Sequence, residues 1–278
     1  MKIVQTITKA TLVAAVLAIA AAPTLFALTS SPVTPVAPGE WTQEVADAGG
    51  VVEFVTDGAP AGLGDGSLKL STSAEVESRA SLGRLASLPL SELTAASYWT
   101  KQITSVPADG NATFQLDLML SDAADSEVTF TYQPSTQLMF NQSATPVQNG
   151  VWQQWDVRSG FFQASKSYVG GFGEVIGGAG SVSYYTVDDI LAFFPTAQVV
   201  GHAVNLGPNA AGFETRVDGV TINDTVYDFE YSSSYTIFSK DECKKYGWKT
   251  LKTREGLSFK NQGDCVSYAV HQEKLLKI

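Results

Sequence analysis

The stretch Thr113-Phe114-Gln115-Leu116-Asp117-Leu118-Met119-Leu120 decides the fold class of this chain. Apolar and polar side chains alternate along it, so in a β-strand one face is buried and the other is polar. Val128–Tyr132 repeats that alternation, and Gly, Asp, Asn and Pro turns separate further short runs of the same kind. We expect such strands at 51–55, 67–71, 154–157 and 197–206. Many short antiparallel strands at this spacing predict a mostly β domain, a β-sandwich or jelly roll, over residues 41–231.

Two local signals refine this prediction. Alternating runs at 216–222 and 225–230 flank Asn223-Asp224, a pair that favours the tight turn of a β-hairpin. One short inserted helix is expected after Thr186, which can cap it, and Pro195 stops it. The glycine-rich stretch 170–180 lacks the Lys-Ser/Thr of a phosphate-binding loop, so we interpret it as a flexible loop.

Residues 1–27 have the three-part pattern of a cleavable signal peptide. Two lysines precede an apolar run from Ala10 to Ala22, and Ala27 offers a small residue at the cleavage point. The alternative, a transmembrane anchor, needs about 20 apolar residues, and this run is shorter. Residues 28–40, rich in Pro, Ser and Thr, are expected to form an extended linker. We therefore expect a secreted protein with no membrane span after signal cleavage.

The composition limits the kinds of partner that the chain can bind. Its net charge is −10 and its pI about 4.7, and an acidic surface repels phosphate backbones, which makes nucleic acid a poor partner. Hydrophobic residues make up 44% of the chain, enough for a sizeable core. These values fit a globular extracellular module and leave its oligomeric state open.

The only two cysteines, Cys243 and Cys265, lie near the C-terminus. In an exported protein an even pair most simply forms a disulfide, whereas a metal site needs more ligands. Ser239–Glu242 is a capping-box pattern for a first short helix ending at Gly247, and 261–264 can start a second helix. The sequence predicts a small helical segment over 232–278, tied together by this disulfide.

Several strings resemble uncharacterised secreted bacterial β-sandwich proteins. The most specific pair, Cys243–Trp248 and Phe259–Tyr268, is similar to a terminal segment of many such exported proteins. Shorter matching strings lie at 90–98, 152–156, 204–207, 217–222 and 227–230. The resemblance covers most of the chain after residue 27. It implies the β-sandwich fold and export, and it brings no catalytic residues.

More loosely, Gly64–Leu70 and Val217–Val220 look like parts of jelly-roll carbohydrate-binding modules. Such modules often hold a structural calcium ion where the first and last strands meet. Under that resemblance Glu53, Asp65 and Asp228 could supply the hard oxygen ligands that calcium prefers. The alternative is that they are turn and edge residues of an acidic protein, since no dense ligand string is present. We expect no cofactor and leave a structural calcium ion open.

Catalytic groups are hard to find in this sequence. His202 lies inside an apolar strand and is interpreted as a core histidine, His271 sits in the terminal helix, and no Gly-x-Ser-x-Gly elbow surrounds a serine. A glycoside hydrolase needs only two carboxylates, so that class remains an alternative. The acidic residues considered fall mostly at turns or helix starts: Asp117, Asp156, Glu174, Asp188 and Asp189.

Aromatic side chains are the better candidates for a site. They stack on the apolar faces of sugars and anchor protein interfaces, and the alternative role is packing in the core. Trp152 and Trp155 are three residues apart, so on a strand they point to opposite faces. The residues predicted to bind ligand are Trp99, Trp152, Trp155, Phe161 and Phe162.

These observations favour a secreted, non-catalytic module that binds an extracellular glycan or cell-surface material. The first alternative is a structural or adhesive surface protein that binds other proteins, which a continuous apolar patch would favour. The second is a glycoside hydrolase or lyase on the same fold, which two carboxylates facing each other across a cleft would favour.

Overall fold

The computed structural model describes residues 28–35, 37–45, 49–75, 77–104, 111–123, 125–141, 143–170, 175–177, 183–207, 210–231, 239–244, 246–251 and 259–275. The predicted signal peptide, residues 1–27, and most of the glycine-rich stretch 170–180 lie outside these ranges. Within the described part of the chain, no helix is both long enough and apolar enough to cross a membrane.

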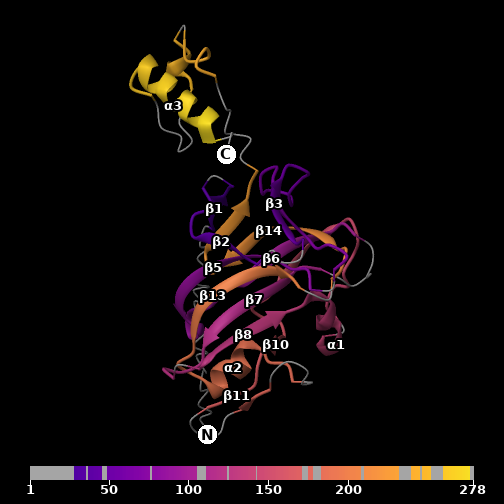
Figure 1. Cartoon of the computed structure of the whole chain (residues 1–278). Helices are drawn as coiled ribbons and strands as arrows, with labels where there is room; N and C mark the ends of the chain where they lie inside the picture. Colours follow the sequence, from indigo (N-terminus) through magenta and orange to yellow (C-terminus); the bar gives the residue numbers. More distant parts are fainter. Residues whose placement is uncertain are drawn as a thin grey trace, which may run out of the picture.

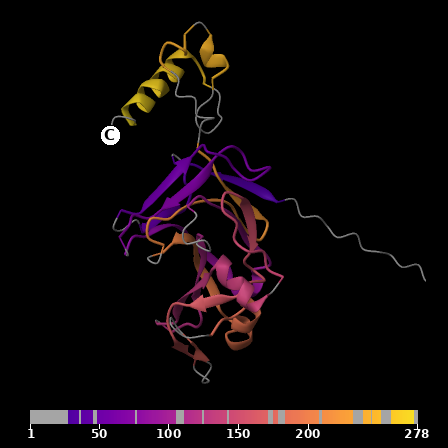
Figure 2. The ribbon, with the colours of Figure 1, turned by 90° about the vertical axis from the view of Figure 1, so that its right-hand side faces the viewer.

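Most of the described chain forms two curved β-sheets, visible from two sides in Figures 1 and 2. Sheet 1 follows the order β1-β15-β14-β4-β3, with β6 paired to β14 and β9 paired to β6. Sheet 2 follows the order β10-β8-β7-β13-β5-β2. The strands of sheet 1 are β1 (Thr29–Val33), β3 (Val51–Val55), β4 (Ser67–Ser71), β6 (Ala96–Gln102), β9 (Trp152–Asp156), β14 (Glu214–Ile222) and β15 (Thr225–Phe229). Those of sheet 2 are β2 (Trp41–Val45), β5 (Ala80–Pro89), β7 (Thr113–Met119), β8 (Glu127–Tyr132), β10 (Phe162–Ala164) and β13 (Gln198–Leu206).

The core lies between the inner faces of the two sheets. Tyr98 of sheet 1 packs against Phe114 of sheet 2, with ring centroids 5.5 Å apart, and both side chains are fully buried. The predicted alternation on β7 is confirmed, because Phe114, Leu116 and Leu118 are buried while the residues between them are half-buried. The predicted mostly β sandwich is therefore confirmed.

The predicted hairpin near residue 220 is also present. β14 and β15 are antiparallel, and Asn223 in the turn between them has a positive φ of 53°. Its side-chain oxygen accepts the backbone N–H of Thr94 at 2.8 Å, which ties the turn to the start of β6. Asparagine tolerates this left-handed conformation better than most residues, so sequence and backbone agree here.

The inserted helix is α2 (Val187–Phe193), and Thr186 caps it as predicted. The Thr186 hydroxyl accepts the backbone N–H of Asp189, and the Asp189 carboxylate accepts the N–H of Thr186. A further short helix, α1 (Gln137–Phe140), was not predicted. The described residues also form three 3₁₀ turns and a small hairpin: η1 (Leu90–Glu92), η2 (Pro134–Thr136), η3 (Gly247–Lys249), and β11 (Tyr168–Val169) with β12 (Val175–Ile176).

The predicted linker at 28–40 is wrong for its first part. Residues 29–33 form β1, which pairs in parallel with β15 at the edge of sheet 1. Pro32 lacks a backbone N–H, and an edge strand tolerates a proline because one side of the strand makes no ladder hydrogen bonds. Val33 is buried in the core, so this segment belongs to the sandwich.

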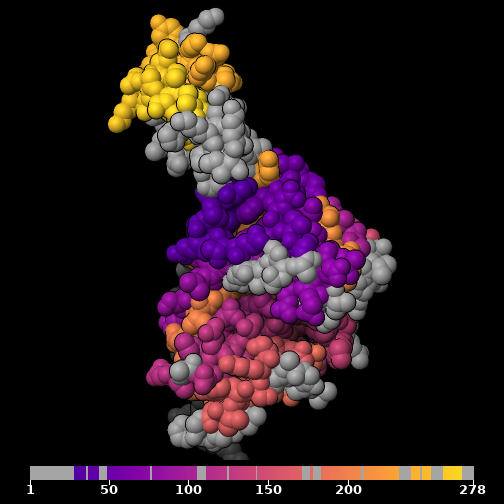
Figure 3. Space-filling model, viewed as in Figure 1, coloured from indigo at the N-terminus to yellow at the C-terminus, as the bar shows by residue number. Residues whose placement is uncertain are grey.

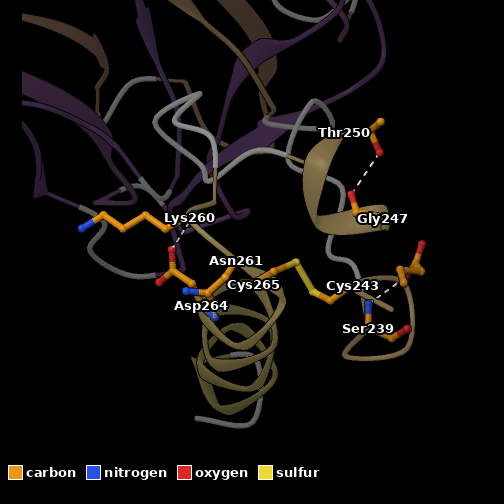
Figure 4. Close-up of a disulfide and its surroundings, with 9 residues drawn as sticks. Ser239, Cys243, Gly247, Thr250, Lys260, Asn261, Asp264 and Cys265 are labelled. Atoms are coloured by element: carbon orange, nitrogen blue, oxygen red, sulfur yellow. Dashed lines mark hydrogen bonds between the residues drawn. A yellow bond between two sulfur atoms is a disulfide. The ribbon is translucent and has the colours of Figure 1, made fainter. Parts of the chain in front are cut away.

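The C-terminal segment has a small core of its own, separate from that of the sandwich. Cys243 and Cys265 form the predicted disulfide and are fully buried together with Phe259 and Ala269. The predicted second helix is confirmed as α3 (Gln262–Leu275), and the Asn261 side chain accepts the backbone N–H of Asp264 at its start (Figure 4). In the space-filling view the C-terminal segment, drawn in orange and yellow, forms a group beyond the end of the sandwich (Figure 3).

The predicted first helix of the segment, from Ser239 to Gly247, is wrong. Residues 240–244 form turns, and the helical turn that the described residues within 239–251 contain is η3, which begins at Gly247 instead of ending there. The Glu242 carboxylate accepts the Ser239 backbone N–H at 2.6 Å, half of the predicted capping box (Figure 4). Tyr246 has a positive φ of 71°, which is incompatible with a continuing α-helix.

Candidate ligand-binding site

The five aromatic residues predicted to bind ligand fall into three structural environments. Trp99 and Trp152 lie on the outer face of sheet 1, Trp155 and Phe161 line a pocket at its edge, and Phe162 is in the core. Trp152 and Trp155 point to opposite faces of β9, as predicted from their spacing. The structure therefore brings four of the five residues to one region of the molecule.

The outer-face pair follows from the register of β6 and β9. Trp99 lies directly opposite Gln154, and Lys101 lies opposite Trp152. Trp99 and Trp152 are consequently diagonal neighbours on one face, a spacing across which large aromatic side chains can touch. Both are half-buried, so each keeps part of its ring surface accessible. We call these two residues the tryptophan platform.

The pocket has a volume of about 250 Å³ and lies where the edge strand β9 of sheet 1 approaches β8 and α1. Both Trp155 and Phe161 line it; Trp155 is only 4% exposed, whereas Phe161 is half-buried. Gln154 and Asp156 belong to β9 and contribute polar atoms, and Gln154 also faces Trp99. The pocket and the tryptophan platform are therefore continuous through Gln154.

The wall of the pocket that carries Phe161 is held in place by Gln137 of α1. The Gln137 amide donates to the Phe161 carbonyl at 3.0 Å and accepts the Phe161 N–H at 2.9 Å. Gly160 also matters here, because a Cβ at this position would come within 2.2 Å of the Tyr132 ring. This local fixing means that a ligand would meet a preformed wall, which lowers the entropic cost of binding.

Aromatic and apolar surface extends beyond the pocket. Phe161 stacks on Phe140 with ring centroids 4.7 Å apart, and Phe140 also contacts Tyr184 at 4.5 Å. Next to Phe140 on α1, Met139 is 71% exposed and Leu138 is 37% exposed. Sequence reasoning missed this aromatic cluster, because Phe140 and Tyr184 lie far apart in the chain and only the fold brings them to Phe161.

The prediction that Phe162 binds ligand is wrong, because the structure places this residue in the core. Its side chain is fully buried and packs against Tyr132, with ring centroids 6.0 Å apart. Phe161 and Phe162 are adjacent on an extended segment, so only one of them can face outward. The Trp155 side chain is held on its buried side, because its indole N–H donates to the Thr100 hydroxyl at 2.7 Å.

The three residues considered for a structural calcium ion do not converge. Glu53 pairs with Lys69 on β4 at 3.2 Å. Within the described ranges, no group of three or more His, Cys, Asp or Glu side chains has the arrangement of a metal site. The backbone N–H groups of Asp65 and Gly66 bond instead to the Glu230 carboxylate, at 3.2 and 2.9 Å, which ties the loop before β4 to the end of β15.

Asp218 is the most perturbed acid in this neighbourhood. Its side chain is fully buried, and one carboxylate oxygen accepts the backbone N–H groups of Gly219 and Phe229 at 2.7 and 2.8 Å. Burial is the main cause that raises the pKa of Asp218 to about 8; the two backbone hydrogen bonds oppose the rise, and the nearby Asp228 and Glu230 contribute to it. The carboxyl group links β14 to β15, which gives it a structural role in the fold.

Comparison with known proteins gives distant structural likenesses. No known protein family and no curated protein matches the sequence. A family 11 carbohydrate-binding module from Clostridium thermocellum, in complex with a β-1,3-1,4-mixed-linked tetrasaccharide, is 12% identical with a TM-score of 0.38, over 69% of this chain and 91% of that one. The cellulose-induced protein Cip1 is 12% identical with a TM-score of 0.39, over 67% and 92%.

An exo-β-agarase is also 12% identical, with a TM-score of 0.36, over 67% of this chain and 23% of that one. The neighbours thus include carbohydrate-binding modules as well as a glycoside-active enzyme. At these identities and TM-scores the likeness is a distant one of fold, and it assigns no function to this chain.

Proposed function

We propose that this chain is a secreted, non-catalytic module that binds an extracellular glycan along the tryptophan platform and the adjoining pocket. The observation that carries this proposal is the continuity of Trp99 and Trp152 with the Phe161 pocket through Gln154. Aromatic rings offer flat apolar surface to the C–H faces of sugar rings, and neighbouring amide and hydroxyl groups bond to sugar hydroxyls.

The polar lining supports a neutral sugar chain. Asn141, Ser143, Gln154 and Ser159 supply uncharged donors and acceptors around the pocket. Asp156 is the one carboxylate among the described lining residues, whereas the usual glycosidase mechanism uses two. We therefore propose binding without hydrolysis. The Cys243–Cys265 disulfide supports an extracellular location, because such bridges persist in oxidising compartments.

The experiment is a glycan-array screen of the purified chain, followed by titration of each hit with tryptophan fluorescence. Trp152→Ala and Phe161→Ala should each weaken binding by about tenfold or more, a loss of roughly 1.4 kcal/mol. Phe193→Ala is the matched control, because Phe193 is also aromatic and 43% exposed but lies on α2, outside the site. Wild-type affinity in both site variants, or no glycan hit at all, would contradict the proposal.

A second candidate function rests on a specific surface. Leu138, Met139 and Phe140 expose apolar side chains next to one another on α1, and such a patch can serve as a protein interface. If Met139→Lys abolished binding to a protein partner while glycan binding stayed unchanged, the adhesive function would be favoured instead.

A further inference from the structure

A second cleft, of about 650 Å³, lies away from the proposed glycan site. Its lining comes mainly from β5, β13 and the β14–β15 hairpin, whereas the glycan pocket lies at β8, β9 and α1. In the strand order of sheet 2, β8 and β5 are separated by β7 and β13. The two cavities have no lining residue in common.

His202 lines this cleft with unused hydrogen-bonding capacity. Its side chain is 2% exposed, and neither ring nitrogen has a hydrogen-bond partner in the part of the chain that the structure describes. Burial, together with a smaller contribution from the nearby Arg84 guanidinium, lowers the pKa of His202 to about 4, so the ring is neutral at pH 7. A neutral imidazole carries one donor and one acceptor, and leaving both buried and unpaired costs free energy.

The ring of His202 is held in a fixed orientation by its neighbours. It makes an edge contact with Trp41 at 5.2 Å between centroids and stacks parallel to Phe114 at 6.2 Å. These aromatic contacts offer no partner to the ring nitrogens. A native structure that keeps two such atoms unpaired calls for a physical reason, and a bound polar group is one of the recognised reasons.

Arg84 supplies the positive charge of the cleft. It lies directly opposite His202 in the β5–β13 register, and its guanidinium sits 4.9 Å from the centre of the Tyr227 ring. It donates to the Tyr227 hydroxyl and to the carboxylate of Glu40. The Glu40 side chain is 71% exposed, so this carboxylate reaches Arg84 from the surface and can be replaced by another one.

We propose that this cleft binds an acidic sugar, a uronic acid unit, whose carboxylate replaces Glu40 on Arg84 and whose hydroxyl group pairs with His202. A guanidinium binds a carboxylate through two parallel hydrogen bonds, which a neutral sugar cannot match. A hydroxyl group can either donate or accept, so it can pair with one of the two nitrogens of a neutral imidazole, whichever of them it reaches. Leu88, Val199 and Ile222 give the cleft an apolar wall for the sugar ring.

The test uses sodium glucuronate as the probe, with glucose as its neutral counterpart. Binding to the full chain is followed by isothermal calorimetry and by chemical-shift changes of Arg84, His202 and Tyr227. Glucuronate should bind and glucose should bind at least about tenfold more weakly, the usual effect of losing one charged hydrogen-bond partner. A glucuronate oligomer in a separate titration distinguishes a free monosaccharide from a unit within a polymer.

Four variants test the assignment of this site. Glu40→Gln should tighten glucuronate binding, because it removes the carboxylate that competes for Arg84, and a purely structural role of Arg84 would not produce that gain. Arg84→Gln and His202→Phe should each weaken binding, with near-ultraviolet circular dichroism confirming that the core is intact. Trp152→Ala should leave it unchanged, which separates this site from the proposed glycan site. Equal binding of glucose, weaker binding by Glu40→Gln, or no glucuronate signal would each overturn the inference.

Discussion

The sandwich and the C-terminal segment of this chain are stabilised in different ways. The sandwich buries Phe114, Leu116 and Phe130 between two sheets, and its strand pairs include long-range ones such as β7 with β13. Among the described residues of the C-terminal segment, the core consists of four buried side chains, and two of these are the cysteines of the disulfide. A segment this small cannot bury enough apolar surface to fold by burial alone, so a covalent link compensates.

The largest expected effect is the loss of a sandwich core residue. Phe114→Ala should lower the free energy of unfolding by about 3–5 kcal/mol, because it removes a fully buried ring and leaves a cavity. The measurement is urea denaturation followed by tryptophan fluorescence. Leu85→Ala is the control, because Leu85 is 81% exposed and its loss should change stability by about 0.5 kcal/mol or less. If Phe114→Ala also melted α3, the two regions would be one cooperative unit.

The next effect is the removal of the disulfide. The combined variant Cys243→Ser and Cys265→Ser should destabilise the C-terminal segment by about 3 kcal/mol, since the bridge closes a loop with a sequence separation of 22. Helical signal from α3 should fall in far-ultraviolet circular dichroism while the urea midpoint of the sandwich stays the same. Ser267→Ala, at an exposed position of α3, is the control. An unchanged helical signal without the bridge would contradict this comparison.

The same difference explains how far the sequence predicted the fold. Periodicity predicted the strands of the sandwich, because alternation records which face is buried, and the capping residue Thr186 predicted the start of α2. Periodicity failed for β1. Pro32 and its polar neighbours are typical of a linker, and the segment is a strand because it pairs with β15. The capping pattern at Ser239 also gave a wrong prediction. The residues after it form turns, and the Cys243–Cys265 disulfide holds this part of the chain in place of a helix.

The candidate sites show the same contrast between local patterns, which the sequence reveals, and long-range contacts, which it does not. The spacing of Trp152 and Trp155 predicted opposite faces, a local property of a strand. No local pattern shows which of Phe161 and Phe162 faces outward, because that depends on β10 pairing with β8. The meeting of Arg84 with His202 is set by strand register between residues more than a hundred positions apart, so a single sequence carries no signal for it.

The smallest expected effect concerns pH, and it should appear in the sandwich alone. Because burial raises the pKa of Asp218 to about 8, the folded state holds a proton that the unfolded state loses near pH 4. Stability should therefore fall as the pH rises from about 4 to about 8. His202, whose pKa is lowered to about 4, acts in the opposite sense, because the unfolded state takes up a proton below about pH 6.5.

Asp218→Asn should flatten the fall between pH 5 and pH 8 and gain about 1–3 kcal/mol at pH 8, since the amide keeps the acceptor used by Gly219 and Phe229 and carries no charge. His202→Phe should instead reduce the loss of stability below about pH 6.5, because it removes the side chain that stays neutral in the folded state while it takes up a proton in the unfolded state. Urea midpoints measured across this pH range for both variants and the wild type give the result. An unchanged slope in Asp218→Asn would mean that Asp218 is ionised in the folded sandwich, and that the buried charge is compensated by a partner at its second carboxylate oxygen.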